Sequence, residues 1–175
     1  DRPRSRVLVG GLGLGFTLRA TLPLLRRDAT VVVAELMQPV VDWNRDPAFG
    51  LGGDALADPR VEVVVGDVAD VIRKGRFDTI LLDVDNGPSG LSTAANDRLY
   101  SAAGIAAART ALLPGGSLVV WSATDDAAFA DRLRHAGFDV AVERFHTHGD
   151  RGGRAVLFGG RLQAVSGGGR SAPRR

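Results

Sequence analysis

The stretch that decides the fold is VLVGGLGLGFTLR, residues 7–19. An apolar run typical of a buried strand enters a cluster of glycines and leaves in a helical pattern. Because glycine has no Cβ, Gly11, Gly13 and Gly15 let the backbone turn sharply and approach a ligand closely. The helix that follows directs its free N–H groups toward the same place. We therefore expect a strand, a ligand-binding turn and a helix in this order.

A second strand is predicted at TVVVAE, residues 30–35, and it ends on a carboxylate. Glu35 follows Gly15 by twenty residues, the spacing at which an acid at the end of a second strand reaches a ribose diol. Residues 6–35 are therefore predicted to form a βαβ nucleoside-binding unit. The alternative is that the glycines only close a tight turn, which leaves Glu35 without a role.

The rest of the chain alternates apolar runs with helical patterns, which predicts an α/β fold with a mostly parallel, doubly wound sheet. Two final strands joined by a glycine-rich turn predict an antiparallel C-terminal hairpin, giving seven strands in all. Further strands are expected at 61–65, 79–82, 117–122, 138–146 and 154–158, with helices at 16–27, from Pro39, at 68–73, 94–112 and 125–136.

Length and composition indicate one domain over residues 1–160, which the βαβ unit and the acids described below lead us to expect as a nucleoside-binding catalytic domain. It is followed by a basic, Gly/Ser-rich tail at 161–175 that we expect to be disordered. Residues 1–160 carry a net charge of −2, so no nucleic-acid partner is expected. No apolar run approaches membrane-spanning length, so no membrane association is expected. The absence of cysteine fits a reducing cytoplasm.

Polar residues at the ends of further strands are expected to share one cleft, because ligands of such sheets bind beyond the carboxyl ends of the strands. Gly66, Asp67 and Val68 follow the third strand, and Asp67 is placed to accept from an exocyclic amine such as that of adenine. Its alternative role is an N-cap for the helix at 68–73.

Asp83 and Asp85 follow the fourth strand. Two neighbouring carboxylates make a negative pocket that attracts a cation and takes a proton from an ammonium group. The alternative is an Asp-Asn-Gly-Pro turn in which both acids bind only backbone N–H groups. His146 and His148 are interpreted as surface residues, and no metal site is predicted.

Several of these motifs together resemble the spermidine synthase family, over about residues 6–122. They are VLVGGLGLGFTLR (7–19), VAEL (33–36) with VV (40–41), RVEV (60–63) with GD (66–67), FD (77–78) through Asp83 with GP (87–88), LYS (99–101) and LPGG (113–116). The resemblance implies the class I S-adenosylmethionine-dependent methyltransferase fold. It also implies an aminopropyltransferase, in which an amine such as putrescine attacks the propyl carbon of decarboxylated S-adenosylmethionine and releases 5′-methylthioadenosine.

By the same resemblance, Glu35 matches the ribose-binding acid, Asp67 the adenine-binding acid and Asp83 the acid that deprotonates the attacking amine. That last role agrees with the chemistry, because a primary amine near pKa 10 cannot attack until it loses its proton. Family members usually pair, so the resemblance also implies a homodimer.

Three departures from the family pattern are visible. Leu14 stands where the family has an aspartate that binds the aminopropyl ammonium. The segment from Asp83 to Pro88 is two residues shorter, so its second acid is Asp85 or none. The chain begins almost at the first core strand, so we expect it to lack the family's N-terminal strand-rich region. A methyltransferase on a small acceptor and a non-catalytic nucleoside-binding homologue therefore remain alternatives.

Overall fold

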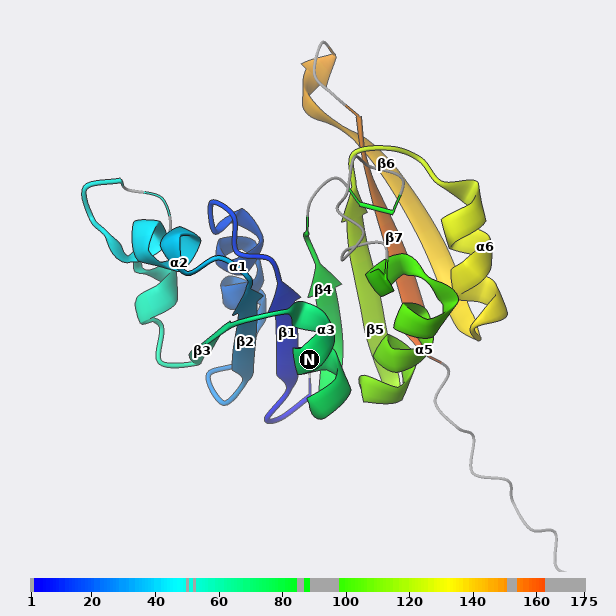
Figure 1. The fold of residues 1–175 in the computed structure, drawn as a ribbon, viewed down its shortest axis with the longest axis horizontal. Coiled ribbons are helices and arrows are strands. Elements are labelled where there is room, and N and C mark those ends of the chain that lie inside the picture. Colours follow the sequence, from blue (N-terminus) through cyan, green and yellow to red (C-terminus); the bar gives the residue numbers. More distant parts are fainter. Residues whose placement is uncertain are drawn as a thin grey trace, which may run out of the picture.

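A seven-stranded sheet in the order β3-β2-β1-β4-β5-β7-β6 forms the centre of the molecule (Figure 1). The computed structural model describes residues 2–49, 51, 53–84, 87–88, 98–150 and 154–162. The strands are β1 (Arg6–Gly10), β2 (Thr30–Glu35), β3 (Val61–Val65), β4 (Phe77–Leu82), β5 (Leu112–Ser122), β6 (Phe138–Asp150) and β7 (Arg154–Leu162).

Most of the sheet is parallel. The pairs β1–β2, β1–β4, β2–β3 and β4–β5 are all parallel, and β7 pairs antiparallel with both β5 and β6. Only β7 therefore runs against the other strands. The predicted fold class, mostly parallel with an antiparallel C-terminal hairpin, is confirmed.

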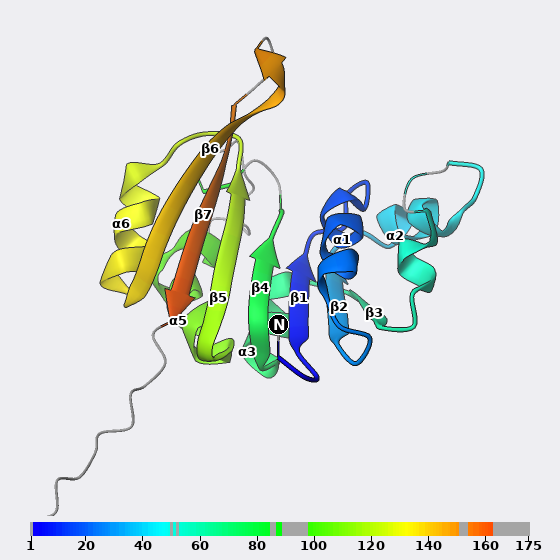
Figure 2. The same ribbon diagram turned by 180° about the vertical axis from the view of Figure 1, so that it is seen from behind.

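Helices cover both faces of the sheet (Figures 1 and 2). They are α1 (Phe16–Thr21), α2 (Gln38–Arg45), α3 (Val68–Lys74), α5 (Ala102–Ala111) and α6 (Ala127–His135), with short 3₁₀ helices η1 (Leu22–Leu24) and η2 (Gly53–Ala57). In the described part of the chain, none of these helices has the length and apolar character needed to span a membrane.

Three helix boundaries differ from the sequence prediction. The first helix ends at Thr21 rather than residue 27, because Pro23 cannot donate the next helical hydrogen bond and the chain continues as η1. The helix expected over 94–112 is interrupted at Ser101: residues 98–100 are helical, and α5 begins after Ser101, whose hydroxyl accepts from Gly104 N at 3.2 Å. Residues 91–97 lie outside the described part. The cap of α6 is Asp126, not residue 124 or 125.

The LPGG signal at 113–116 predicts a turn before the fifth strand, whereas β5 already begins at Leu112. Phe77 pairs with Leu112 and Thr79 pairs with Ser117, so the register shifts between these two pairs. Gly115, at φ 78°, lies in the extra residues. The glycines thus make an irregularity within a strand pair.

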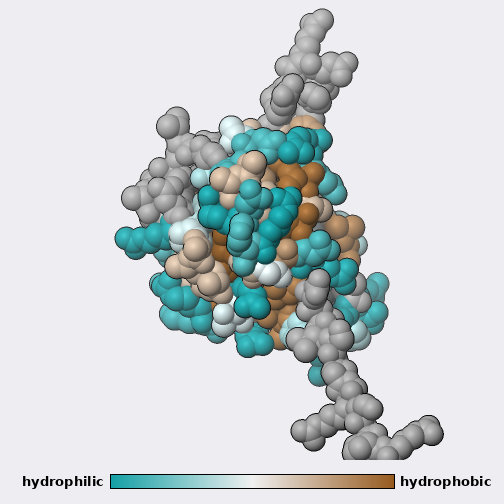
Figure 3. All heavy atoms as spheres, turned by 90° about the vertical axis from the view of Figure 1, so that its right-hand side faces the viewer, coloured by the Kyte–Doolittle hydropathy of each residue, from teal (hydrophilic) through white to brown (hydrophobic). Residues whose placement is uncertain are grey.

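Each face of the sheet has its own hydrophobic core. On the face under α3, α5 and α6, Phe129 packs edge-on against Tyr100 and Phe158, and all three are buried. On the other face α1 and α2 cover a smaller core that includes Leu18 and Val41. Figure 3 shows the side of the molecule at the right of Figure 1, where hydrophilic side chains cover much of the surface and hydrophobic patches remain between them. The sheet is thus packed on both faces, which places the ends of its strands between two cores.

Candidate functional site

A cavity of about 290 Å³ lies at the carboxyl ends of β1, β2, β3 and β4. The sequence-predicted residues that line it are Gly11, Gly13, Glu35, Gly66, Asp67, Val68 and Asp83. The other lining residues are Ala34, Leu36, Met37, Val40 and Val84. The structure therefore brings the acids of three strand ends to one cavity, at the point where the strand order reverses between β1 and β4. Their individual roles stay predictions.

The chain passes very close to itself at Gly11. Gly11 N donates to Ala34 O, and Asp83 N donates to Gly10 O, both at 2.8 Å, so the turn lies between the ends of β2 and β4. A Cβ at position 11 would come within 2.2 Å of Asp83 O, and φ is +88°. Only glycine fits here, because both the left-handed backbone and the close approach exclude a side chain.

The two later glycines of the loop play different parts. Gly13, at φ +50°, has no atom of the described residues within 4 Å of the position its Cβ would take, so that part of the chain leaves the loop open there. Gly15, at φ 74°, stands at the N-cap of α1 and does not line the cavity. Its left-handed backbone gives it a conformational role at the helix start, and its role as a binding residue stays a prediction.

Glu35 joins the end of β2 to both neighbouring loops. The residue is 8% exposed, and its carboxylate accepts from Leu12 N through Oε2 and from Met37 N through Oε1, each at 2.9 Å. These two hydrogen bonds compensate the burial of the charge. Because each carboxylate oxygen has a second lone pair, Glu35 still has acceptor capacity toward the cavity.

Asp67 is exposed at the cavity rim and also caps α3. Its Oδ1 accepts from Ala69 N at 2.7 Å, so the capping role given above as an alternative is present. Among the described residues Oδ2 accepts no hydrogen bond. One oxygen therefore starts the helix while the other is available to a donor in the cavity.

Asp83 follows β4 and is held by a side chain from α1. Thr17 Oγ1 donates to Asp83 Oδ2 at 2.5 Å, which leaves Oδ1 for another partner. Tyr100, buried in the core, donates from its hydroxyl to Val84 O at 3.1 Å and fixes the next residue. Asp85 lies outside the described residues.

Sequence reasoning missed two side chains that shape the loop, Thr17 and Asn44. Asn44 Nδ2 donates to Gly13 O at 2.8 Å across 31 residues, and the contact of Thr17 with Asp83 spans 66 residues. Thr17 lies inside the glycine-rich stretch and one turn beyond Gly13, so its place in the first helical turn was the available signal. Asn44 gave none beyond being an amide in a helix.

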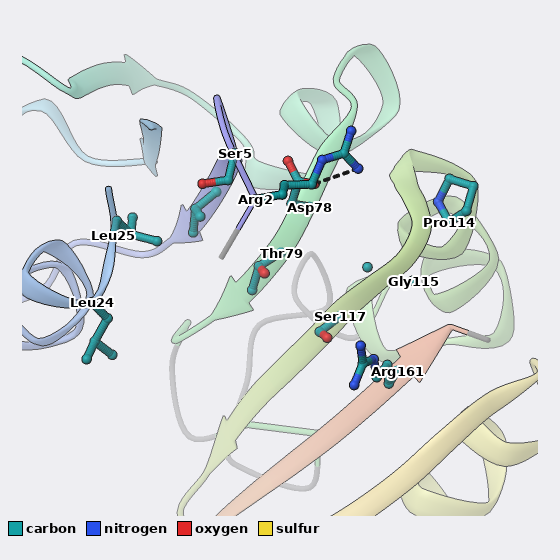
Figure 4. Close-up of a pocket in the computed structure, with 12 residues that line it drawn as sticks. Arg2, Ser5, Leu24, Leu25, Asp78, Thr79, Pro114, Gly115, Ser117 and Arg161 are labelled. Atoms are coloured by element: carbon teal, nitrogen blue, oxygen red, sulfur yellow. Dashed lines mark ion pairs between the residues drawn. The ribbon is translucent and has the colours of Figure 1, made fainter. Parts of the chain in front are cut away.

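A second cavity, of about 450 Å³, lies at the opposite end of the strands (Figure 4). Ser5 and Thr79, at the amino ends of β1 and β4, line it, and Arg2 forms an ion pair with Asp78 at 3.1 Å beside it. Of the predicted site residues that the structure describes, none lines this cavity. Because parallel sheets bind ligands at the carboxyl ends of their strands, the smaller cavity is the candidate site.

Comparison with known proteins supports the resemblance. No family model matches the chain. Polyamine aminopropyltransferases of Mycobacterium tuberculosis and Mycobacterium bovis are 31% identical over 161 residues, an alignment that covers 85% of this chain and 29% of each relative. The chain thus spans less than a third of the length of these curated relatives.

Solved structures show the same fold. A spermidine synthase in complex with the transition state analogue AdoDATO superposes with a TM-score of 0.68 at 22% identity, covering 91% of this chain and 54% of that one. The spermidine synthase of Thermotoga maritima gives 0.69 at 20% identity, covering 91% and 53%. Human methyltransferase-like protein 13 in complex with SAH gives 0.65 at 19% identity, covering 95% and 74%. Over most of its own length the chain is therefore a homologue of the polyamine aminopropyltransferases, built on the fold that spermidine synthases share with class I methyltransferases.

Proposed function

We propose that this chain carries the nucleoside-binding and catalytic core of an aminopropyltransferase. It would transfer the aminopropyl group of decarboxylated S-adenosylmethionine to a small cationic amine. The observation that carries the proposal is that Glu35, Asp67 and Asp83 line one cavity beside the glycine loop. A volume of about 290 Å³ is at the lower end of small-molecule sites and suits a nucleoside.

Each of the three acids has a different role, which follows from its position in the cavity. Glu35 accepts from the ribose hydroxyls with the lone pairs that its backbone contacts leave free, and Asp67 accepts from the adenine amine through Oδ2. Asp83 takes the proton of the incoming amine through Oδ1, since Thr17 donates to Oδ2. Because the sulfonium is already a good leaving group, deprotonation and positioning of the amine are the main catalytic tasks.

The test is turnover with purified chain, decarboxylated S-adenosylmethionine and putrescine, detecting 5′-methylthioadenosine. Asp83→Asn should lower kcat by about 10²–10⁴-fold while donor affinity by calorimetry changes little, because the amide cannot accept the proton. Asp78→Asn is the matched control, since Asp78 lies on the same strand beside the other cavity. Equal turnover in Asp83→Asn and the control would remove Asp83 from the mechanism.

One observation favours a second candidate, a methyltransferase. Leu14 is 51% exposed and replaces the acid that would bind the aminopropyl ammonium, which leaves room for a donor that keeps its carboxylate. Calorimetry with S-adenosylmethionine beside its decarboxylated form separates the two activities. Tighter binding of the carboxylated donor would support the methyltransferase, and binding of neither would support a non-catalytic homologue. A homodimer is proposed from the resemblance to the family, and a cytoplasmic location from the absence of cysteine.

A further inference from the structure

Asn44 is a buried amide that the proposed reaction does not use. It lies in the last turn of α2 and is 3% exposed, on the same helix face as the buried Val41. The flanking Trp43 and Arg45 are exposed. Asparagine is a poor helix former and is mostly found at the surface, so its burial here calls for a specific contact.

That contact is with the glycine loop. Asn44 Nδ2 donates to Gly13 O and to Val40 O, each at 2.8 Å. Both neighbours are carbonyl oxygens, which only accept hydrogen bonds. The amide nitrogen must therefore face them, and its two N–H groups are both used.

The other end of the same amide has no partner. Among the described residues, Asn44 Oδ1 is one of the buried side-chain atoms without a hydrogen bond. A buried acceptor left unpaired destabilises a fold, and an apolar side chain of similar shape would remove that cost. Stability alone therefore does not explain an asparagine at this position.

The hydrogen bond from Asn44 to Gly13 O fixes the direction of the peptide group between Gly13 and Leu14. In a trans peptide the C=O of Gly13 and the N–H of Leu14 point to opposite sides, so the Leu14 N–H points away from α2. Among the described residues, neither the Gly13 nor the Leu14 N–H group donates to a protein acceptor. Glu35 holds the preceding Leu12 N–H, so the loop is fixed at two successive points by β2 and α2.

We propose that Asn44 is a positioning residue of the nucleoside site, which keeps the glycine loop in its binding shape before the ligand arrives. The proposal rests on the proposed function for the identity of the ligand. The hydrogen bond by which Asn44 fixes the loop does not depend on which ligand binds. A loop fixed in advance loses less conformational freedom on binding, and ligand affinity rises accordingly.

The experiment compares the wild-type chain with Asn44→Leu, which keeps the approximate shape and removes both donors. Calorimetry with 5′-methylthioadenosine should show a loss of affinity of about tenfold, with kcat reduced less than kcat/KM because Asn44 touches no reacting atom. Amide hydrogen exchange, measured by NMR, should rise at least tenfold at Leu12, whose N–H donates to Glu35 in the closed loop, while the Gly13 and Leu14 N–H groups serve as unprotected references. The temperature of unfolding should stay equal or rise, because the unpaired Oδ1 is gone.

Asp42→Leu is the matched control, since Asp42 lies on the exposed face of the same helix. It should change neither affinity nor loop exchange. A folded Asn44→Leu with wild-type loop exchange would overturn the proposal, even if its unfolding temperature fell. Should Asn44→Leu fail to fold, Asn44→Ser gives the same two readouts with a smaller side chain. Faster loop exchange in a protein whose wild type binds no nucleoside would support the hold on the loop and contradict the proposed function.

Discussion

Gly11 is the residue at which the cleft tolerates the least change. A methyl group there would meet the backbone of Asp83 at 2.2 Å, and φ of +88° disfavours any side chain. We predict that Gly11→Ala lowers the free energy of unfolding by about 3 kcal/mol, because strain and clash add. Urea denaturation measures the change.

Gly13→Ala is the matched comparison. Its φ is also positive, at +50°, but no atom in the described part of the chain lies within 4 Å of the added methyl group. Its cost should be only that of the left-handed backbone, about 1 kcal/mol. Equal losses in the two variants would show that the approach of Asp83 does not constrain position 11.

Glu35 combines a structural and a binding task in one carboxylate. In Glu35→Gln an NH₂ group must face the N–H of either Leu12 or Met37, so one hydrogen bond becomes a donor–donor contact. We predict a loss of about 2 kcal/mol in stability together with weaker binding of 5′-methylthioadenosine. Thermal unfolding and calorimetry are measured on the same sample. Glu62→Gln, on the exposed side of β3, should alter neither, and an unchanged stability of Glu35→Gln would contradict the two backbone contacts.

At the scale of single elements, α3 offers a way to separate the two roles of Asp67. Asparagine caps a helix as well as aspartate does, so Asp67→Asn should leave stability within a few tenths of a kcal/mol and still weaken nucleoside binding. Asp67→Ala should weaken binding and also lower stability by about 1 kcal/mol, because the bond to Ala69 N is lost. Chemical denaturation and calorimetry distinguish the two effects. Full affinity in Asp67→Asn would leave the residue as a cap only.

The entry to β3 is held by a bidentate ion pair. Arg60 Nε contacts Asp58 Oδ1 at 2.9 Å and Arg60 Nη2 contacts Oδ2 at 2.8 Å, while Nη1 donates to Leu25 O at the end of η1. The hydrogen bonds from Arg60 lower the pKa of Asp58 from 3.8 to about 2. A pKa lowered in the folded state means that the stabilisation is present above about pH 4 and is lost as pH falls toward 2.

Asp58→Asn should therefore lower the free energy of unfolding by about 1 kcal/mol at pH 7, a value reduced for partial solvent exposure. The difference between wild type and variant should shrink between pH 4 and pH 2, where the wild type protonates Asp58. Urea denaturation at a series of pH values measures both curves. Curves that stay parallel down to pH 2 would contradict the ion pair.

The sequence was a better guide to strands than to helix ends. The apolar runs of β1, β2 and β3 are long enough to identify each strand, whereas the ends of the helices depend on single residues. Pro23 ends α1 early and Asp126 rather than its neighbour caps α6, because several adjacent residues had suitable chemistry. Competing local signals of similar strength cannot be ranked without the tertiary structure.

At the scale of the whole molecule, some site residues could be predicted from the sequence and others could not. Glu35 and Asp83 could be predicted because parallel strands place their carboxyl ends on one edge, a rule of topology. Thr17 and Asn44 could not, because their contacts join segments 66 and 31 residues apart and depend on how α1 and α2 pack. Positions fixed by topology were predictable, and those fixed by packing were not.

Because the two faces of the sheet have separate cores, we predict that a substitution in one core can lower stability without changing nucleoside affinity. Phe129, with no exposed surface, packs at ring distances of 5.8 Å from Tyr100 and 5.2 Å from Phe158, in the core opposite α1 and α2. Phe129→Ala should lower the free energy of unfolding by about 4 kcal/mol, since a large cavity replaces the ring. That is a large share of the 5–15 kcal/mol typical of a domain.

Nucleoside affinity of Phe129→Ala, measured where the variant is still folded, should stay within about twofold of wild type, because Phe129 does not line the cavity and the Tyr100 hydroxyl keeps its hydrogen bond to Val84 O. Phe145→Ala is the control, since this ring is 40% exposed on β6 and its removal should cost under about 1 kcal/mol. A tenfold loss of affinity in folded Phe129→Ala would mean that the core under α5 and α6 also sets the shape of the cavity. The ends of β4 and β5 would then have to move with that core, and the cleft could not be treated as a feature of the glycine loop and its neighbouring strands alone.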